Sequence, residues 1–314
     1  MRYRNLGNST LKVSVVGLGA NNFGARVDYQ QTEKVIRKAI DEGINFIDTA
    51  NIYGGGLSEE YIGEVLKNIP EPVLVATKVG MSRGGFPNGA GASRKHIIDQ
   101  VEVSLTKLKR DHIDLYQIHQ PDNDTDIEET LQALDDLVHQ GKILYIGCSN
   151  FSTWEICESI WVSRTRNINP FVSTQPEYSM LERDVEKEMV PFCNKYGIGI
   201  LPYYPLARGF LTGKYRQNEP IPKGTRLAND STNQERLFSE NNFSILEDLE
   251  RFSEENGRTI TQLAIAWLLY NPAVSSVIAG ATNVEQVTAN AKAWDWDLSE
   301  KDVSIINGIL CKNC

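Results

Sequence analysis

Four ionisable side chains occur where short apolar runs of the sequence end. Asp48, Lys78 and His119 each close a run rich in β-branched residues, and Tyr53 follows shortly after Asp48. Taken singly, each has an ordinary explanation, such as a helix cap, a loop anchor, a solvated strand end or a satisfied loop histidine. Their joint occurrence at the same end of three successive predicted strands instead favours one shared site.

The chemistry expected of this set is acid catalysis by Tyr53. A tyrosine hydroxyl has a pKa of about 10 and is a poor acid at neutral pH, but a nearby Lys78 ammonium favours the phenolate and lowers that pKa. Asp48 would keep Lys78 charged, and His119 would hydrogen-bond the substrate oxygen. The sequence has four histidines and shows neither clustered metal ligands nor an activated thiolate. An acid that protonates oxygen then needs a partner that delivers hydride.

The elements that must position these residues alternate along the chain. Eight short runs are expected strands: Val13 to Gly17, Asn45 to Asp48, Val73 to Thr77, Ile113 to Ile118, Leu144 to Ser149, Val172 to Gln175, Ile198 to Tyr203 and Val277 to Ala279. The expected helices between them include Thr32 to Glu42, Ser58 to Leu66, Ser93 to Leu108, Ile127 to His139, Thr153 to Ser163 and Asp184 to Tyr196. This alternation predicts the α/β class and one (β/α)8 TIM barrel domain over residues 1–314.

Additional segments decorate this expected barrel. Arg2 to Arg4 and Leu11 to Lys12, separated by a Gly-Asn-Ser turn, predict an N-terminal β-hairpin that caps the amino-terminal end of the strands. Leu206 to Asn241 is rich in Gly, Pro, Asn and charged residues. A long segment of this kind is more typical of a binding lid than of a linker. A further C-terminal piece begins at Ala293.

Composition restricts the partners. The formal net charge of −9 provides no positive field for nucleic acid or anionic lipid, and no apolar run long enough to span a membrane is present. An anionic cofactor would need a local cluster of backbone N–H, Lys and Arg groups. The five cysteines are an odd, scattered set, so we expect a cytoplasmic protein without a disulfide framework. Cys311-Lys-Asn-Cys314 has CxxC spacing at the C-terminus, where we expect a frayed tail and leave a redox role open.

Several motifs follow one another in a fixed order. They are Gly17-Leu-Gly-Ala20-Asn21-Asn-Phe-Gly24, Asp48-Thr-Ala-Asn-Ile-Tyr53-Gly, Leu115-Tyr-Gln-Ile-His119, Ile146-Gly-Cys-Ser149-Asn150-Phe, Gln175-Pro-Glu-Tyr178 and Tyr203-Tyr-Pro205-Leu206-Ala-Arg208-Gly209. Together with Lys78, they resemble the motifs of the aldo-keto reductases over nearly the whole chain. The resemblance implies NAD(P)H-dependent reduction of a small aldehyde or ketone, with Tyr53 as general acid supported by three residues, Lys78, Asp48 and His119.

The resemblance also implies a cofactor site. Tyr203 would stack on the nicotinamide ring, and the carboxamide would be hydrogen-bonded by Ser149, Asn150 and Gln175. The full set of implied cofactor contacts is Ala20, Asn21, Asp48, Ser149, Asn150, Gln175, Tyr203, Pro205, Leu206, Arg208, Gly209, Lys214, Arg226, Gly280, Thr282, Gln286 and Asn290. Stacking and fixed amide contacts would orient the ring for hydride transfer.

The segment after the seventh strand resembles the branch of this family that contains potassium-channel β-subunits and similar bacterial aldo-keto reductases. There, Lys214, Arg226 and the turn near Thr282 imply a clamp over the pyrophosphate and adenosine, with NADPH as the expected cofactor. Residues 280–290 contain no Lys or Arg, although many relatives bind the 2′-phosphate with a basic residue there, so NADH stays open. Tyr204 stands where a serine is common, which removes one hydroxyl from the expected phosphate contacts.

Two other functions stay open at this stage. One is a redox-sensing regulatory subunit that binds nicotinamide cofactor and turns over slowly, as the channel-subunit resemblance permits. The other is an aldolase with Lys78 as Schiff-base nucleophile, which pairing with Asp48 opposes because that carboxylate would keep the amine charged. Asn21, where many relatives carry a bulky apolar side chain, suggests a polar pocket for hydroxylated, sugar-like substrates. The individual substrate and the oligomeric state are not determined by the sequence.

Overall fold

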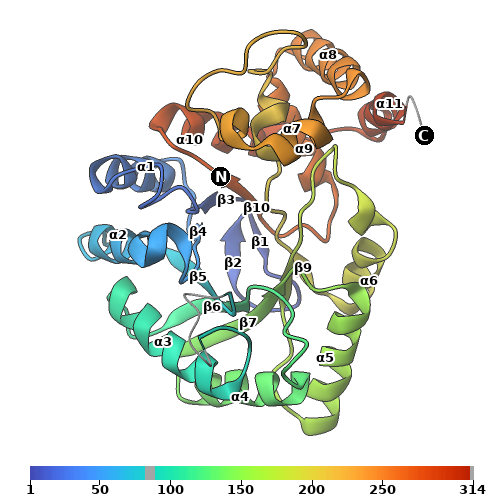
Figure 1. Cartoon of the computed structure of the whole chain (residues 1–314). Coiled ribbons are helices and arrows are strands. Elements are labelled where there is room, and N and C mark those ends of the chain that lie inside the picture. The colour runs from blue at the N-terminus through green and yellow to red at the C-terminus, as the bar shows by residue number, and fades with distance from the viewer. Residues whose placement is uncertain (82–88, 312–314) are drawn as a thin grey trace.

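The computed structural model describes residues 1–81 and 89–311, and within them eight parallel strands form one sheet. The strands are β3 (Val16–Gly19), β4 (Phe46–Asp48), β5 (Leu74–Val79), β6 (Ile113–Ile118), β7 (Ile143–Ser149), β8 (Ser173–Gln175), β9 (Gly199–Ile200) and β10 (Val277–Gly280). Their order is β10-β3-β4-β5-β6-β7-β8-β9. Isolated parallel bridges from Ile200 to Val274 and from Tyr203 to Ile278 join the β9 segment, at one end of this order, to the β10 segment at the other end. The predicted (β/α)8 barrel is confirmed (Figure 1).

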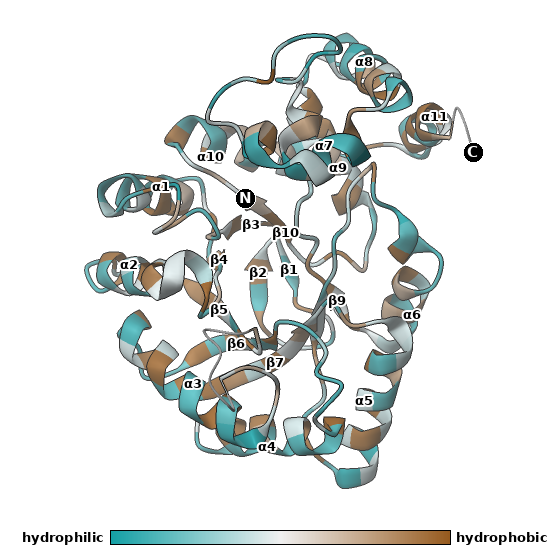
Figure 2. Cartoon of the chain, viewed as in Figure 1, coloured by the Kyte–Doolittle hydropathy of each residue, from teal (hydrophilic) through white to brown (hydrophobic). Residues whose placement is uncertain are grey.

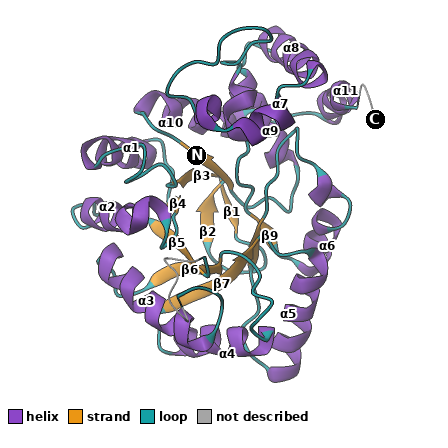
Figure 3. Cartoon of the chain, in the orientation of Figure 1, coloured by secondary structure: helices purple, strands orange, loops and turns teal. Residues whose placement is uncertain are grey.

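Helices surround this sheet, as Figure 3 shows. They are α1 (Tyr29–Asp41), α2 (Leu57–Leu66), α3 (Arg94–Leu108), α4 (Ile127–His139), α5 (Thr153–Arg166), α6 (Met189–Tyr196), α7 (Ser231–Leu237), α8 (Glu240–Glu255), α9 (Ile260–Tyr270), α10 (Val284–Ala291) and α11 (Glu300–Leu310). Several carry hydrophilic and hydrophobic residues on different faces (Figure 2), as helices packed on one side do. None in the described part of the chain is long and apolar enough to cross a membrane.

Short polar side chains determine where the barrel helices begin. The Asp28 carboxylate accepts a hydrogen bond from the Gln31 N–H at the start of α1, and Ser93 caps α3 in the same way. Ser152 and Glu155 form a reciprocal capping box at the start of α5. These caps satisfy N–H groups that have no partner within the helix. Each of these three helices thereby begins at a defined residue.

The N-terminal hairpin closes one end of the barrel, as predicted. Strands β1 (Tyr3–Asn5) and β2 (Lys12–Ser14) pair antiparallel. Leu6 and Val13 are fully buried in a cluster with side chains from inside the barrel, namely Phe46, Ala76, Leu115, Leu201 and Ile278. The second and larger cluster fills the space between the strands and the helices. The carboxyl ends of the strands lie opposite the hairpin and remain available for a site.

Several predicted elements differ from the structure in their bounds, most of all the run Ile198 to Tyr203, of which β9 covers only Gly199–Ile200, and two others differ in kind. The run Val13 to Gly17 is divided, because β2 uses residues 12–14 for the hairpin and β3 begins at Val16. The predicted helix Asp184 to Tyr196 begins as a 3-10 turn, η2 (Asp184–Glu186), and is α-helical from Met189. Apolar periodicity alone cannot reveal either change, since both runs are continuous in pattern. The expected lid region contains the short 3-10 helices η3 (Ala207–Thr212) and η4 (Arg226–Asn229) as well as α7.

Arg4 attaches the hairpin to the barrel, and its loss should be measurable. Its guanidinium donates to the backbone carbonyls of Val274 at 2.6 Å, Leu269 at 2.7 Å and Asn271 at 3.2 Å. Arg4→Met should lower the free energy of unfolding by about 2 kcal/mol, because these charge-assisted hydrogen bonds are lost. Urea-induced unfolding measures this loss. The exposed residue Lys12 provides a matched control, and an Arg4→Met loss no larger than that of Lys12→Met would contradict the assignment.

Candidate active site

A buried ion pair lies at the carboxyl ends of β4 and β5. The Lys78 ammonium lies 2.6 Å from Asp48 Oδ2 and donates to the Thr49 carbonyl at 2.8 Å. It also lies 3.5 Å from the Tyr53 hydroxyl. The side-chain exposures of Lys78 and Asp48 are 0% and 3%. The structure therefore brings three of the four predicted catalytic residues into one connected group.

The second carboxylate oxygen of Asp48 is fixed from across the barrel. Gln117 Nε2 on β6 donates to Asp48 Oδ1 at 3.1 Å, and Gln175 Nε2 on β8 donates to the same atom at 2.9 Å. Both glutamines are buried. A buried carboxylate needs such donors, because an unpaired one would carry a large desolvation penalty. The orientation of Asp48, and through it Lys78, depends on two further strands.

Tyr53 is positioned by a tight turn that follows β4. The turn is η1 (Tyr53–Gly56), in which Gly54 and Gly55 have positive φ values of 57° and 67°. A Cβ atom on Gly54 would come within 2.5 Å of the Phe23 carbonyl oxygen, so glycine is required by space as well as by conformation. The backbone can then turn sharply, and the Tyr53 ring remains against Lys78, whose ammonium lies 5.1 Å from the ring centre.

Burial and charge act in opposite directions on this group. Burial raises the pKa of Tyr53, and although Lys78 lowers it as expected from the sequence, the net shift is upward. Burial by itself would lower the pKa of Lys78, but Asp48 and Tyr53 together outweigh it and the pKa is raised. Both groups therefore hold their protons at neutral pH. Tyr53 is therefore a weak acid that gives up its proton only to a strongly basic group.

His119 lies beside Tyr53 and is held uncharged. Its ring meets the Tyr53 ring edge to face, with centres 5.7 Å apart. Burial, with a smaller contribution from Lys78, lowers the pKa of His119 to about 3. Its Nδ1 atom is buried and has no hydrogen-bond partner in the described part of the chain. A neutral imidazole that faces the Tyr53 ring can donate a hydrogen bond to, or accept one from, a polar group that enters there.

These residues open into a cavity of about 740 Å³. Tyr53, Asp48 and His119 line it, whereas Lys78 lies behind them and is fully buried. All of the predicted cofactor contacts line this same cavity: Ala20, Asn21, Asp48, Ser149, Asn150, Gln175, Tyr203, Pro205, Leu206, Arg208, Gly209, Lys214, Arg226, Gly280, Thr282, Gln286 and Asn290. Residues separated by more than two hundred positions in the sequence thus share one wall.

Near Tyr53 the cavity wall is a network of amide and hydroxyl groups. The Tyr203 hydroxyl donates to Asn150 Oδ1 at 2.8 Å. Asn150 Nδ2 donates to the His119 carbonyl at 2.8 Å, and the Ser149 hydroxyl donates to the Gln175 carbonyl at 2.8 Å. Asn150 has a positive φ of 62°, which asparagine tolerates better than most residues. The network fixes the orientation of these side chains.

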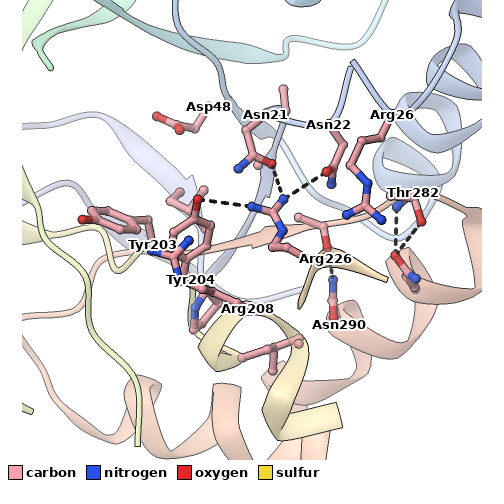
Figure 4. A pocket seen from close by; sticks show the side chains of 18 of the residues that line it. Asn21, Asn22, Arg26, Asp48, Tyr203, Tyr204, Arg208, Arg226, Thr282 and Asn290 are labelled. Atoms are coloured by element: carbon pink, nitrogen blue, oxygen red, sulfur yellow. Dashed lines mark hydrogen bonds between the residues drawn. The ribbon is translucent and has the colours of Figure 1, made fainter. Parts of the chain in front are cut away.

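Further along, the cavity is strongly basic. Arg26, Arg208, Lys214 and Arg226 line it, while Asp48 is the sole carboxylate among the described lining residues. Arg226 donates to Asn21 Oδ1 at 3.1 Å and to Asn22 Oδ1 at 3.0 Å, as Figure 4 shows. These bonds connect the residues between β9 and α8 to the loop after β3. The local cluster of cations expected from the overall acidity of the chain is present here.

Tyr204 organises two of these cations. The Arg208 guanidinium carbon lies 4.0 Å from the Tyr204 ring centre, and that of Arg226 lies 5.1 Å from it. Arg226 also donates to the Tyr204 hydroxyl at 3.2 Å. An aromatic ring contacted by two guanidinium groups restricts where both can point. Tyr204, which stands where a serine was expected, therefore positions Arg208 and Arg226.

The far end of the cavity is the turn between β10 and α10. Gln286 Oε1 accepts hydrogen bonds from the Thr282 backbone N–H at 2.8 Å and from its hydroxyl at 3.2 Å. Asn290 Nδ2 donates to the Gly280 carbonyl at 3.4 Å. Asn283 caps α10, so the positive end of this helix is directed toward the cavity end.

Several residues of the cavity wall were not expected from the sequence, among them Arg26, Thr261 and Gly224. Arg26 follows the first barrel strand, and the rule that loops after strands line the site could have indicated it. Thr261 lies on α9, and no sequence signal pointed to it. The cysteines within the described residues, Cys148, Cys157, Cys193 and Cys311, are all free, and Cys314 lies outside these residues. No group of side chains suited to a metal ion occurs in the described ranges.

Comparison with known proteins agrees with this arrangement. Residues 15–310 match the model of the aldo/keto reductase family. A protein of Arabidopsis thaliana named as a probable voltage-gated potassium channel subunit beta is 38% identical over 304 residues, which cover 94% of this chain and 92% of that protein. A protein of Oryza sativa subsp. japonica with the same name is 36% identical over 302 residues, with coverage of 94% and 92%.

The buried pair Lys78–Asp48 should behave as a coupled unit in stability measurements. Asp48→Asn should lower the free energy of unfolding by about 3–5 kcal/mol, because it leaves a buried ammonium without its counter-charge. The double variant Asp48→Asn/Lys78→Met should lose less than this single variant. Urea unfolding at pH 7 measures both. The exposed pair Lys187–Asp184 is the control, and simple additivity of the two buried substitutions would refute the coupling.

Proposed function

The chain belongs to the aldo/keto reductase family, and on that premise we propose that it uses NADPH to reduce an aldehyde or ketone to an alcohol. The observation that carries this proposal is the placement of Tyr53, backed by the Lys78–Asp48 ion pair, in the wall of the cavity that also holds the basic cluster. An acid at one end and cations at the other suit a carbonyl substrate and a dinucleotide, respectively.

In this proposal Tyr53 gives its proton to the carbonyl oxygen. The phenolate that remains is stabilised by the Lys78 ammonium 3.5 Å away, and Asp48 keeps that ammonium charged and in place. Neutral His119, which lines the cavity beside the Tyr53 ring, donates a hydrogen bond to the same oxygen and orients the carbonyl group. The cofactor, when bound, supplies the hydride.

The residues fit such a cofactor. We assign the nicotinamide carboxamide to Ser149, Asn150 and Gln175, whose side chains form a fixed polar wall beside Tyr53. Tyr203 would lie against the ring. Lys214 and Arg226 would hold the phosphates, since both line a cavity that contains one carboxylate among its described residues.

The substrate is proposed to be a small carbonyl compound in the cytoplasm. Ile52 and Met81 add apolar surface to the cavity wall. From the sequence, Asn21 suggested a polar pocket for hydroxylated substrates. Its amide oxygen accepts a hydrogen bond from Arg226, so we assign Asn21 to the part of the cavity that would hold the cofactor. A sugar-like substrate stays within this proposal but would have to be recognised by other groups.

The relatives are named as potassium channel subunits, and a slow redox-sensing subunit is an alternative compatible with those names that turnover can test. A sensor and a reductase would share cofactor binding and differ in the rate of carbonyl reduction. Oxidation of NADPH followed at 340 nm with a panel of aldehydes, ketones and aldoses separates them. Sustained turnover supports the reductase, whereas tight binding with no turnover on any carbonyl compound would favour the sensor.

Replacing the proposed acid should remove chemistry but leave cofactor binding intact. Tyr53→Phe deletes one hydroxyl, so kcat should fall by about 10²- to 10⁴-fold, the usual contribution of a general acid. The Kd for NADPH should change less than twofold, because the proposed cofactor contacts remain. Steady-state kinetics and calorimetry measure the two quantities. Tyr270→Phe, on the exposed end of α9, is the control, and full activity in Tyr53→Phe would exclude Tyr53 as the acid.

The pH dependence of the hydride-transfer step should be flat across the neutral range. The pKa of His119 is about 3, so this residue is uncharged throughout and adds no inflection between pH 5 and 8. The pKa of Tyr53 is raised above its ordinary value, so its acid form is lost only in strongly alkaline solution. Single-turnover rates with an excess of enzyme report this step. A rate that halves near pH 6.5 would show that a histidine titrates in the reaction.

A further inference from the structure

Arg26 is a cation in the cavity wall that takes no part in the proposed contacts with the nicotinamide or the pyrophosphate. It lies in the loop between β3 and α1 and lines the cavity. Its guanidinium donates to the Gly224 carbonyl, which belongs to the residues between β9 and α8. None of the ion pairs found among the described residues includes Arg26. A guanidinium with one backbone acceptor keeps several donors for a ligand.

Arg26 lies at the α10 end of the cavity, away from Tyr53. Arg26 and Thr282 both line the cavity, and in Figure 4 both are drawn on the side of Arg226 that is away from Asp48. Gln31 Nε2 from α1 donates to the Thr282 carbonyl at 3.3 Å. The start of α1 and the turn before α10 are thus neighbours. The loop that carries Arg26 borders the same end of the cavity as the α10 N-terminus.

This end of the cavity lacks a basic residue on the α10 side. Residues 280–290 contain no Lys or Arg, although Thr282 provides a hydroxyl and α10 directs its positive end there. A phosphate monoester carries up to two charges at neutral pH and needs charge-assisted hydrogen bonds to bind tightly. Arg26 can supply them from the opposite wall.

The cations here repel one another until an anion binds. Burial lowers the pKa of Lys214, and both Arg26 and Arg226 lower it further. The carboxylate of Asp48 does not relieve this repulsion, because it is already paired with Lys78. Three cations within electrostatic reach of each other exceed the two charges of a pyrophosphate. A ligand with additional negative charge would therefore bind preferentially.

We propose that Arg26 recognises a phosphate monoester on the adenosine ribose of the cofactor, the 2′-phosphate, and so determines the preference for NADPH over NADH. This inference rests on the proposed function, since it concerns the cofactor of that reaction. Arg226 and Lys214 then serve the pyrophosphate common to both cofactors. Arg26 replaces, from the β3–α1 loop, the positive charge that residues 280–290 do not provide.

The test is a comparison of the two cofactors by calorimetry. Arg26→Met should weaken NADPH binding by about 10- to 100-fold, since one charge-assisted contact is removed. It should change NADH binding less than twofold. Arg26→Lys, which keeps the charge, should lie between the two. Arg37→Met on α1, where Arg37 is paired with Glu33 and lies outside the cavity, is the matched control.

Two further measurements separate the possible failures. 2′,5′-ADP should bind more tightly than 5′-ADP to the wild-type protein, and Arg26→Met should abolish that difference. Equal weakening of NADPH and NADH by Arg26→Met would overturn the inference, because it would place Arg26 on the pyrophosphate or in closure of the cavity. The proposed function would survive that result. Failure of the wild-type protein to bind either dinucleotide would overturn both.

Discussion

The ion pair between Lys78 and Asp48 is the constraint on which the rest of the structure depends. Two charges removed from water are tolerable only when each meets its counter-charge and its remaining hydrogen-bond partners. Here the partners come from β4, β5, β6 and β8, through Thr49, Gln117 and Gln175. The barrel must therefore close with its strands in register for the pair to exist. The same closure brings Tyr53 to the ammonium.

The second constraint is the placement of positive charge in an acidic protein. With a net charge of −9, long-range attraction cannot bring an anionic cofactor to the chain, so contacts at short range must do so. The cavity concentrates basic groups from two loops, and Tyr204 holds two of them in place. The ion-pair end of the cavity is electrically balanced, whereas the α10 end is not. In the proposed function, this asymmetry would give the dinucleotide one orientation.

The features that the sequence predicted are those set by local pattern. Asp48, Lys78 and His119 were found because apolar runs mark strands, and strand ends in a barrel share one face. The division of the run Val13 to Gly17 into β2 and β3 was not predicted from the sequence. It results from the pairing of β2 with β1, and the apolar periodicity of the run does not indicate that pairing. Arg26 follows the first barrel strand, so its place in the cavity wall could have been expected. Its hydrogen bond to the Gly224 carbonyl could not, because the two residues are distant in the sequence.

Burial modifies the chemistry that residue types suggest. From the sequence, Lys78 was expected to lower the pKa of Tyr53. It does so, but the burial that makes the ion pair effective raises the pKa by more. In the proposed reaction this suits reduction, which begins with a protonated tyrosine, and opposes alcohol oxidation, which begins with the phenolate. The phenolate becomes favourable only as the carbonyl oxygen gains negative charge and takes the proton. In the proposed reaction, the site is therefore arranged for the charge that develops during reduction and not for the charge of the resting protein.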